Sequence, residues 1–190
     1  MTKSILLVGV GGQGTILASK LLTIGLMQSG YDVKMSEIHG MSQRGGSVSS
    51  QVRYGEKVQS PVIELGGADI LISFEKMEAL RWLEYLRKDG KAVVNDYQIN
   101  PMPVVSGTAD YSGDIAAELK AKVADITFVK AFDEAMALGN PKVLNIVLLG
   151  TIVKMMNLTD IDWNAIIAAE VKKNFIELNQ KALARGLEIV

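Results

Sequence analysis

The sequence contains no cysteine and a single histidine, His39, among its 190 residues. Without cysteine, the chain cannot form a disulfide, a zinc–thiolate site or a cysteine-ligated iron–sulfur cluster. One histidine is also too few for a metal site that is built from several imidazole ligands. If the protein serves redox chemistry, its redox centres therefore lie in another chain.

An excess of one charge and a long apolar run are absent as well. The chain has 20 Lys and Arg residues against 21 Asp and Glu residues, and no block of like charges supports a nucleic-acid-binding face. The longest apolar run, residues 143–156, is interrupted by Asn145 and Lys154 and is too short to span a bilayer. The apolar stretch near the N-terminus is too short for a signal peptide. We therefore expect a soluble, cytoplasmic protein that has no nucleic-acid or membrane partner.

The order of apolar runs and helical stripes predicts an α/β fold. Strands are expected at residues 5–8, 33–38, 47–54, 68–74, 92–95 and 126–131, and helices at residues 15–29, 75–88, 114–124, 141–156 and 163–185. Strands that are apolar throughout and alternate with helices indicate a doubly wound, mostly parallel, Rossmann-like sheet that helices flank. Because the sequence shows no repeat, linker or low-complexity segment, we expect a single domain over residues 1–190.

Several segments depart from the plain alternation of strand and helix. Residues 47–54 alternate between apolar and polar side chains, which predicts a half-exposed strand, and the turn after them leaves room for a local antiparallel excursion. Pro101 and Pro103 predict an extended segment. Asn140 is expected to cap a helix that is apolar nearly all round and therefore buried. Gly186 is expected to end the final helix.

A glycine-rich turn follows the first predicted strand and opens the first predicted helix. It matches G-x-G-x-x-G and reads Gly9-Val10-Gly11-Gly12-Gln13-Gly14. In a dinucleotide site the first glycine permits the tight turn, the second lets an anion approach and the third allows close helix–strand packing. The same turn also suits another phosphate-bearing ligand, because helix N-terminal N–H groups attract anions, or it serves packing alone.

An acidic residue should end the second strand of an NAD site and bind the ribose. Glu37 follows Gly14 by 23 residues, later than that rule expects, so dinucleotide binding is the weaker alternative.

A second polar turn follows the second predicted strand and includes His39, Ser42, Gln43, Arg44, Gly45 and Gly46. Arg44 suits a carboxylate or phosphate, because its planar guanidinium can pair with two oxygens at once. His39 can titrate near neutral pH, although a lone histidine is more often a hydrogen-bonded structural residue. Since strands of an open α/β sheet present ligands at their carboxyl ends, both turns are expected to lie on one functional edge. No Ser-His-Asp pattern is present.

The pair of motifs, GVGGQG and SEIHGMSQRGGSV, resembles the small (beta) subunit of indolepyruvate:ferredoxin oxidoreductase. More broadly, the chain is similar to the gamma subunit or domain of 2-oxoacid:ferredoxin oxidoreductases that act on pyruvate or 2-ketoisovalerate. The resemblance covers essentially the whole chain. The stretch before Arg44 favours the indolepyruvate type, because pyruvate-type gamma chains keep Arg-Gly-Gly but differ before it.

The resemblance implies a hetero-oligomer in which a large cysteine-containing subunit holds thiamine diphosphate, Mg²⁺ and the iron–sulfur clusters. That complex would oxidatively decarboxylate an aryl 2-oxoacid with coenzyme A (CoA), giving an aryl-acetyl-CoA, CO₂ and reduced ferredoxin. This chain would bind and position, and it is a candidate to contact CoA. The residues assigned to ligand binding are Gly9, Gly11, Gly12, Gln13, Gly14, Ser42, Gln43, Arg44, Gly45 and Gly46, and His39 is the only residue considered for proton transfer.

Two other functions remain as alternatives. The glycine turn is compatible with a stand-alone NAD(P)-binding protein. The apolar helix expected after Asn140 is compatible with a scaffold module that docks on a partner and performs no chemistry.

Overall fold

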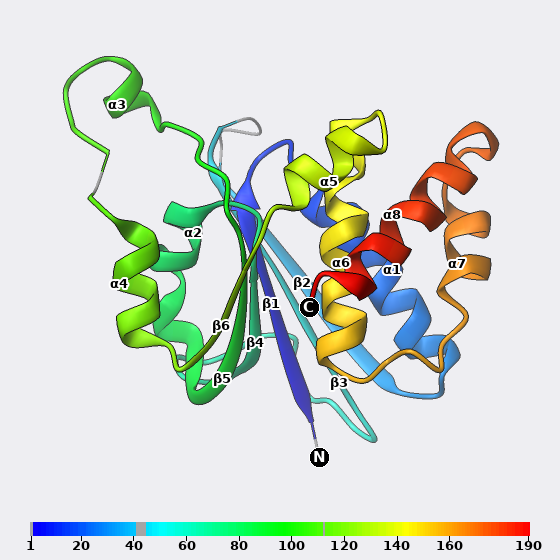
Figure 1. Ribbon diagram of the computed structural model, residues 1–190. Helices are drawn as coiled ribbons and strands as arrows, with labels where there is room; N and C mark the ends of the chain where they lie inside the picture. The colour runs from blue at the N-terminus through cyan, green and yellow to red at the C-terminus, as the bar shows by residue number, and fades with distance from the viewer. Residues whose placement is uncertain (1, 41–44, 112) are drawn as a thin grey trace.

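A six-stranded sheet with the order β2-β3-β1-β4-β5-β6 forms the centre of the computed structural model, which describes residues 2–40, 45–111 and 113–190 (Figure 1). The strands are β1 (Lys3–Val10), β2 (Asp32–His39), β3 (Ser47–Gly55), β4 (Ala68–Ser73), β5 (Leu86–Asn95) and β6 (Asp125–Val129). β1, β4, β5 and β6 pair in parallel, whereas β3 pairs antiparallel with both β1 and β2. The predicted mostly parallel sheet is confirmed.

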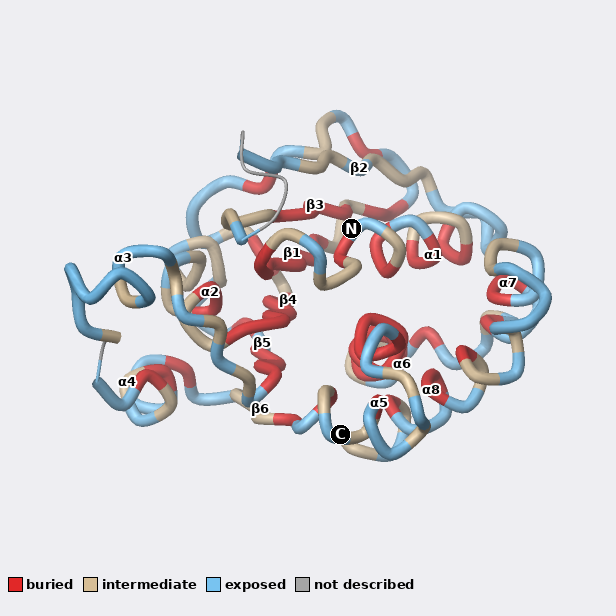
Figure 2. Tube along the Cα trace, turned by 90° about the horizontal axis from the view of Figure 1, so that it is seen from above, coloured by how far each residue is buried: buried red, intermediate tan, exposed pale blue. Residues whose placement is uncertain are grey.

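Helices cover both faces of this sheet (Figures 1 and 2). One face carries α1 (Thr15–Gln28), α5 (Ala131–Ala137), α6 (Leu144–Met155), α7 (Trp163–Glu170) and α8 (Ile176–Glu188), and the other carries α2 (Lys76–Arg81) and α4 (Ile115–Lys122). Short 3₁₀ turns form η1 (Leu83–Tyr85), η2 (Pro141–Val143) and η3 (Lys173–Phe175), and the short helix α3 (Met102–Val105) stands off from the sheet. This arrangement confirms the doubly wound α/β class.

The apolar run that predicted the first strand is explained by burial on both faces. Ile5 and Leu7 pack into the cluster beneath α1 and α6, whereas Leu6 and Val8 pack into the cluster on the opposite face. A strand that is covered on both sides needs apolar residues at every position rather than at alternate ones.

Helix α6 lies inside the thicker helical layer. All ten residues from Leu144 to Val153 are buried, and Figure 2 shows the helix surrounded by α1, α5, α7 and α8. Asn140 caps the preceding η2 turn, since its Oδ1 accepts a hydrogen bond from the Lys142 N–H at 3.0 Å. The buried helix predicted here is confirmed, and its apolar surface is used within the chain rather than offered to a partner.

Strand β3 differs from the half-exposed strand that was predicted. It lies between β1 and β2, and Ser49, Ser50 and Gln51 are buried. The Gln51 side chain is satisfied there, because its Oε1 accepts a hydrogen bond from the Ile63 N–H at 2.6 Å. The alternation of apolar residues with serines in this strand therefore does not mean that the serine side chains are exposed to solvent. β3 gives the sheet the local antiparallel part that the sequence left room for, although the turn after Gly55 leads to no strand before β4.

Two helix predictions are wrong in extent. The helix expected over residues 75–88 ends at Arg81, and β5 begins at Leu86, with an irregularity in its pairing with β4 between Ala68 and Ile70. The final helix is two helices, because Val171 and Lys172 are extended between α7 and η3. Its apolar stripe continues across this break, so the periodicity does not reveal it.

Two further predictions, which were based on the usual preferences of proline and glycine, are wrong. Residues 102–105 form α3 rather than an extended segment, since proline is tolerated in the first turn of a helix. Gly186 lies buried inside α8 instead of ending it. In the part of the chain that the structure describes, no helix is both long and apolar enough to cross a membrane.

Candidate functional site

The two glycine turns are hydrogen-bonded to each other. The Gly11 N–H donates to the Gly46 carbonyl at 2.8 Å, and the Gly45 N–H donates to the Gly11 carbonyl at 3.4 Å. These bonds continue the β1–β3 ladder beyond its last pair, Val10 and Ser47, at the carboxyl edge of the parallel strands. The prediction that both turns lie on one edge is confirmed, and the structure brings them into direct contact.

The glycines of the first turn have roles that differ from those expected. Gly12 and Gly14 have φ values of +103° and +85°, so they rather than Gly9 form the left-handed turn. Gly9 lies within β1, where an added Cβ would stand 2.9 Å from Phe74 Cβ. A Cβ on Gly14 would stand 2.7 Å from Asn145 Nδ2, so this glycine permits close packing against α6 rather than against a strand.

The Gln13 side chain closes the first turn from inside. Its Oε1 accepts a hydrogen bond from the Val10 N–H at 2.8 Å, and its Nε2 donates to the Phe74 carbonyl at 3.0 Å. Both ends of the amide are therefore used within the chain. The predicted contact of Gln13 with a ligand stays a prediction.

The N-terminus of α1 is open to an anion. Its N-cap residue is Gly14, no side chain caps the first N–H groups, and the first turn holds no acidic residue. Unpaired N–H groups and the helix dipole both favour negative charge at such a position. Anion binding at the N-terminus of this 14-residue helix, which the glycine motif predicts, stays a prediction.

Two hollows open beside this turn. One has a volume of about 390 Å³ and is lined by Gly11, Gly12, Gly14, Thr15, Ile16, Glu37, Ile38, His39, Val48, Ser49 and Ser50. The other, of about 470 Å³, shares Gly11, Gly12 and Gly14 and adds Lys142 and the stacked rings of Tyr97 and Phe132, whose centroids are 4.7 Å apart. The backbone of the first glycine turn therefore borders two hollows, of which one is lined by residues of β2 and β3 and the other by two aromatic rings and a lysine.

The position of Glu37 argues against a dinucleotide site. Glu37 lies in β2, and its Oε1 accepts a hydrogen bond from the Ser19 hydroxyl at 3.0 Å. Because β3 lies between β1 and β2, these strands are two spacings apart, about 10 Å, instead of the single spacing of a dinucleotide-binding sheet. The stand-alone NAD(P) alternative is therefore not favoured.

The remaining predicted site residues fall in or beside the second turn. His39 is the last residue of β2, is exposed and borders the smaller hollow, and its role in proton transfer stays a prediction. Ser42, Gln43 and Arg44 lie outside the described residues, so their ligand contacts stay predictions. Gly45 and Gly46 are placed by their bonds to Gly11.

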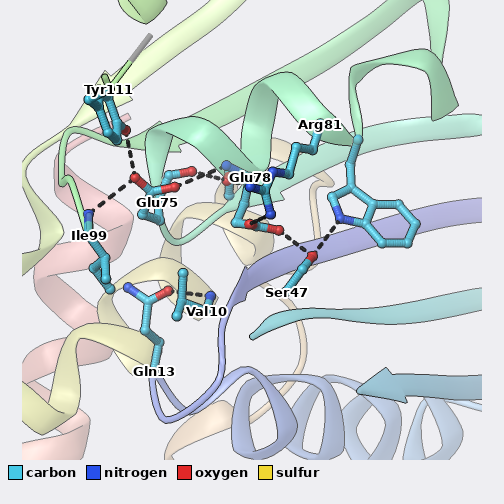
Figure 3. A network of polar contacts seen from close by, with 10 residues as sticks. Val10, Gln13, Ser47, Glu75, Glu78, Arg81, Ile99 and Tyr111 are labelled. Atoms are coloured by element: carbon cyan, nitrogen blue, oxygen red, sulfur yellow. Dashed lines mark hydrogen bonds and ion pairs between the residues drawn. The ribbon is translucent and has the colours of Figure 1, made fainter. Parts of the chain in front are cut away.

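Sequence reasoning missed a buried polar network at the carboxyl end of β4 (Figure 3). Glu75 and Glu78 are 1% and 3% exposed. Glu75 caps α2, since its Oε2 accepts the Glu78 N–H at 3.0 Å, and its Oε1 accepts the Ile99 N–H at 3.2 Å and the Tyr111 hydroxyl at 2.9 Å. The only local signal was an acidic N-cap after a buried strand, because the partners lie 24 and 36 residues away.

Burial raises the pKa of the Glu78 carboxyl above its ordinary value, whereas the Ser47 hydroxyl and Arg81 act in the opposite direction. The folded chain therefore binds this proton more tightly than the unfolded chain. The resulting stability is fully present below the ordinary Glu pKa of about 4.3 and is lost as the pH rises through the folded pKa.

We expect Glu78→Gln, which cannot ionise, to lose less stability than the wild type as the pH rises above the ordinary Glu pKa of about 4.3. Urea unfolding at several pH values measures this difference. Glu177→Gln is the control, because Lys181 lowers the pKa of the exposed Glu177 and the sign is reversed. Parallel pH profiles for Glu78→Gln and the wild type would contradict the expectation.

Within residues 2–40, 45–111 and 113–190, no group of three or more His, Cys, Asp or Glu side chains is placed to bind a metal ion. The site is instead made of backbone N–H groups, glycines and a few polar side chains, which suits recognition of an anionic ligand.

Solved structures share this fold over nearly the whole chain. The gamma subunit of a keto/oxoacid ferredoxin oxidoreductase from Geobacter sulfurreducens matches with a TM-score of 0.72 at 23% identity, over 98% of this chain and 96% of that one. The 2-oxoglutarate:ferredoxin oxidoreductase from Magnetococcus marinus matches with a TM-score of 0.78 at 15% identity, over 99% of this chain but 31% of that longer chain.

Sequence comparison identifies the family. Indolepyruvate oxidoreductase subunit IorB of Thermococcus kodakarensis is 37% identical over 97% of this chain and 94% of its own length, and IorB of Pyrococcus horikoshii is 36% identical over 97% and 94%. A family model described as pyruvate ferredoxin/flavodoxin oxidoreductase matches residues 4–189. The resemblance predicted from the two glycine motifs is therefore confirmed, and the chain belongs to the pyruvate ferredoxin/flavodoxin oxidoreductase family as a subunit of the 2-oxoacid:ferredoxin oxidoreductase type.

Proposed function

We propose that this chain is the non-redox subunit of an enzyme that oxidatively decarboxylates indolepyruvate and related aryl 2-oxoacids. The products are an aryl-acetyl-CoA, CO₂ and reduced ferredoxin. One observation carries the choice of substrate class: relatives named IorB are 36–37% identical, whereas a relative named 2-oxoglutarate synthase subunit KorC, from Methanocaldococcus jannaschii, is 27% identical.

The redox chemistry in this proposal belongs to a larger partner subunit. Thiamine diphosphate with Mg²⁺ would supply the decarboxylation there, and cysteine-ligated iron–sulfur clusters would carry the electrons to ferredoxin. The absence of cysteine from this chain supports this division, because it leaves no thiolate to bind an iron–sulfur cluster. The assembly is accordingly a cytoplasmic hetero-oligomer.

This chain contributes a binding edge for CoA. The open N-terminus of α1 and the backbone of Gly11, Gly12 and Gly14 present N–H groups that suit the CoA phosphates. The adjoining hollow of about 390 Å³ has room for part of such a ligand. Arg44, with Ser42 and Gln43, would add side-chain contacts from the second turn. The pairing of Gly11 with Gly46 supports one site made of both turns.

The test uses the complex purified with its large cysteine-containing subunit. We expect dye or ferredoxin reduction to require CoA, and kcat/KM for indolepyruvate to exceed that for pyruvate and 2-oxoglutarate by at least about tenfold, a difference of about 1.4 kcal/mol in transition-state binding.

A complex that assembles but prefers pyruvate would contradict the aryl substrate class and leave the family unchanged. Heat released on titration of the complex with NADH, without any 2-oxoacid activity, would instead favour the NAD(P)-binding alternative.

A further inference from the structure

Both glycine turns are tied to one short segment, Phe74–Glu78, at the carboxyl end of β4. The first turn reaches it through Gln13, whose Nε2 donates to the Phe74 carbonyl at 3.0 Å. That carbonyl also accepts the Asn95 Nδ2 at 3.1 Å, and the Phe74 N–H donates to the Val8 carbonyl at 2.8 Å. The first turn is therefore fixed to the sheet independently of the second.

The second turn reaches the same segment through Ser47. This residue follows Gly46 directly, and its hydroxyl donates to a Glu78 carboxylate oxygen and accepts from Trp82 Nε1 at 3.2 Å (Figure 3). Gly46 in turn accepts the Gly11 N–H at 2.8 Å. The place of Gly46 against the first turn is thus set on one side by Gly11 and on the other by Ser47 and Glu78.

A contribution to stability does not by itself explain a buried glutamate at position 78. It is 3% exposed and paired with Arg81 at 3.1 Å, while Glu75 lies one helical turn before it. The loss of hydration offsets most of the energy of such a buried pair, and apolar replacements are often as stable. What a carboxylate adds is direction, because it fixes the Ser47 hydroxyl and the Arg81 guanidinium at defined places.

Glu75 binds the segment that contains α3 in a similar way. Its Oε1 holds the Ile99 N–H and the Tyr111 hydroxyl, the two ends of this excursion. Ile99 borders the larger of the two hollows at the first glycine turn. The second glycine turn and the α3 segment, which are distant in sequence, therefore reach two carboxylates that are three residues apart, and the first glycine turn reaches the adjoining Phe74 carbonyl.

We propose that Glu78, acting through Ser47, is a positioning residue that sets the spacing of the two glycine turns and thereby the affinity of the complex for CoA. The proposal rests on the CoA-binding function proposed above. It assigns no catalytic step to Glu78, whose contacts reach only protein groups. Its effect is on binding, so KM for CoA changes while kcat is retained.

Ser47→Ala in the purified complex is the main test. We expect KM for CoA to rise about fivefold, as for the loss of one hydrogen bond, with kcat and KM for the 2-oxoacid within about twofold of the wild type. Glu78→Gln has one oxygen for the two donors, the Ser47 hydroxyl and the Arg81 guanidinium, that the two carboxylate oxygens accept, so it should raise KM for CoA as well, by less than Ser47→Ala does. Ser29→Ala is the matched control, because it removes one hydrogen bond, to the Gly25 carbonyl at 2.9 Å, at the far end of α1.

The outcomes of these tests distinguish a positioning role of Glu78 and Ser47 from a role in stability alone. An unchanged KM for CoA in Ser47→Ala overturns the proposal, and so does a parallel loss of kcat, thermal stability and subunit assembly. A Ser47→Ala effect that Ser29→Ala reproduces also overturns it. A wild-type complex that shows no heat on titration with CoA and oxidises no 2-oxoacid overturns the proposed function itself, and the positioning proposal with it.

Discussion

Gly186→Ala should lower the free energy of unfolding by about 3 kcal/mol, although alanine is the better helix former by about 1 kcal/mol. Gly186 lies in the last turn of α8, where α8 packs against α6. A Cβ added there would stand 2.0 Å from the Val147 carbonyl oxygen and 2.8 Å from the Gly150 Cα. Backbone atoms cannot rotate away as a side chain can, so the two helices must separate.

Urea unfolding followed by circular dichroism measures this loss. Gly150→Ala should act in the same direction, because its Cβ would stand 2.5 Å from the Leu183 carbonyl oxygen. The two variants open the same crossing, so the double variant should lose less stability than the sum of both. Gly113→Ala is the control, since its added Cβ has no neighbour within 4 Å. A Gly186→Ala chain as stable as the wild type would show that this crossing is not close-packed.

Gly186 illustrates what sequence alone can and cannot predict in this fold. Local signals predicted local structure correctly: the apolar run at Ile5 gave a strand buried on both faces, and Asn140 before Pro141 predicted a cap. The glycine at position 186 was assigned to a helix end by its usual preference. Its true role depends on α6, which lies more than thirty residues earlier, and no local pattern carries that contact.

Sheet order is long-range information of the same kind. The sequence predicted a strand at residues 47–54 but did not predict that this strand lies between β1 and β2. Serine occurs both on exposed strand faces and in covered strands, so the serines of β3 did not indicate burial. Because β3 lies between β1 and β2, Glu37 in β2 is farther from β1 than in a dinucleotide-binding sheet. This larger distance argues against a dinucleotide site.

The sequence predicted that the two glycine turns meet at one edge of the sheet, but it did not predict the buried carboxylates behind them. The two glycine turns carry recognisable residue spacings, and parallel strands bring their carboxyl ends together, so their meeting was predictable. Glu75 and Glu78 carry no such pattern. Their partners, Ser47 and Tyr111, lie 31 and 36 residues away, and only the folded chain makes them neighbours.

Gly14→Ala should reduce kcat/KM for CoA by at least about tenfold in the purified complex. Two effects combine at this position. The φ of +85° costs about 1–2 kcal/mol for a residue with a Cβ, and that Cβ would stand 2.7 Å from Asn145 Nδ2. Asn145 also donates a hydrogen bond to the Gly14 carbonyl at 3.2 Å, so the clash displaces the N-terminus of α1, where the CoA phosphates are proposed to bind.

Two companion variants separate the strain from the clash. Gly66→Ala introduces the same backbone strain at a φ of +70°, with no atom within 4 Å of its Cβ and before β4, at the opposite edge of the sheet, so it should leave kcat/KM within about twofold. Asn145→Ala combined with Gly14→Ala removes the atoms that clash at 2.7 and 3.1 Å and should recover part of the lost kcat/KM. If Gly14→Ala affected CoA kinetics no more than Gly66→Ala, the first glycine turn would not contribute to CoA binding, and the ligand would have to lie elsewhere on the chain.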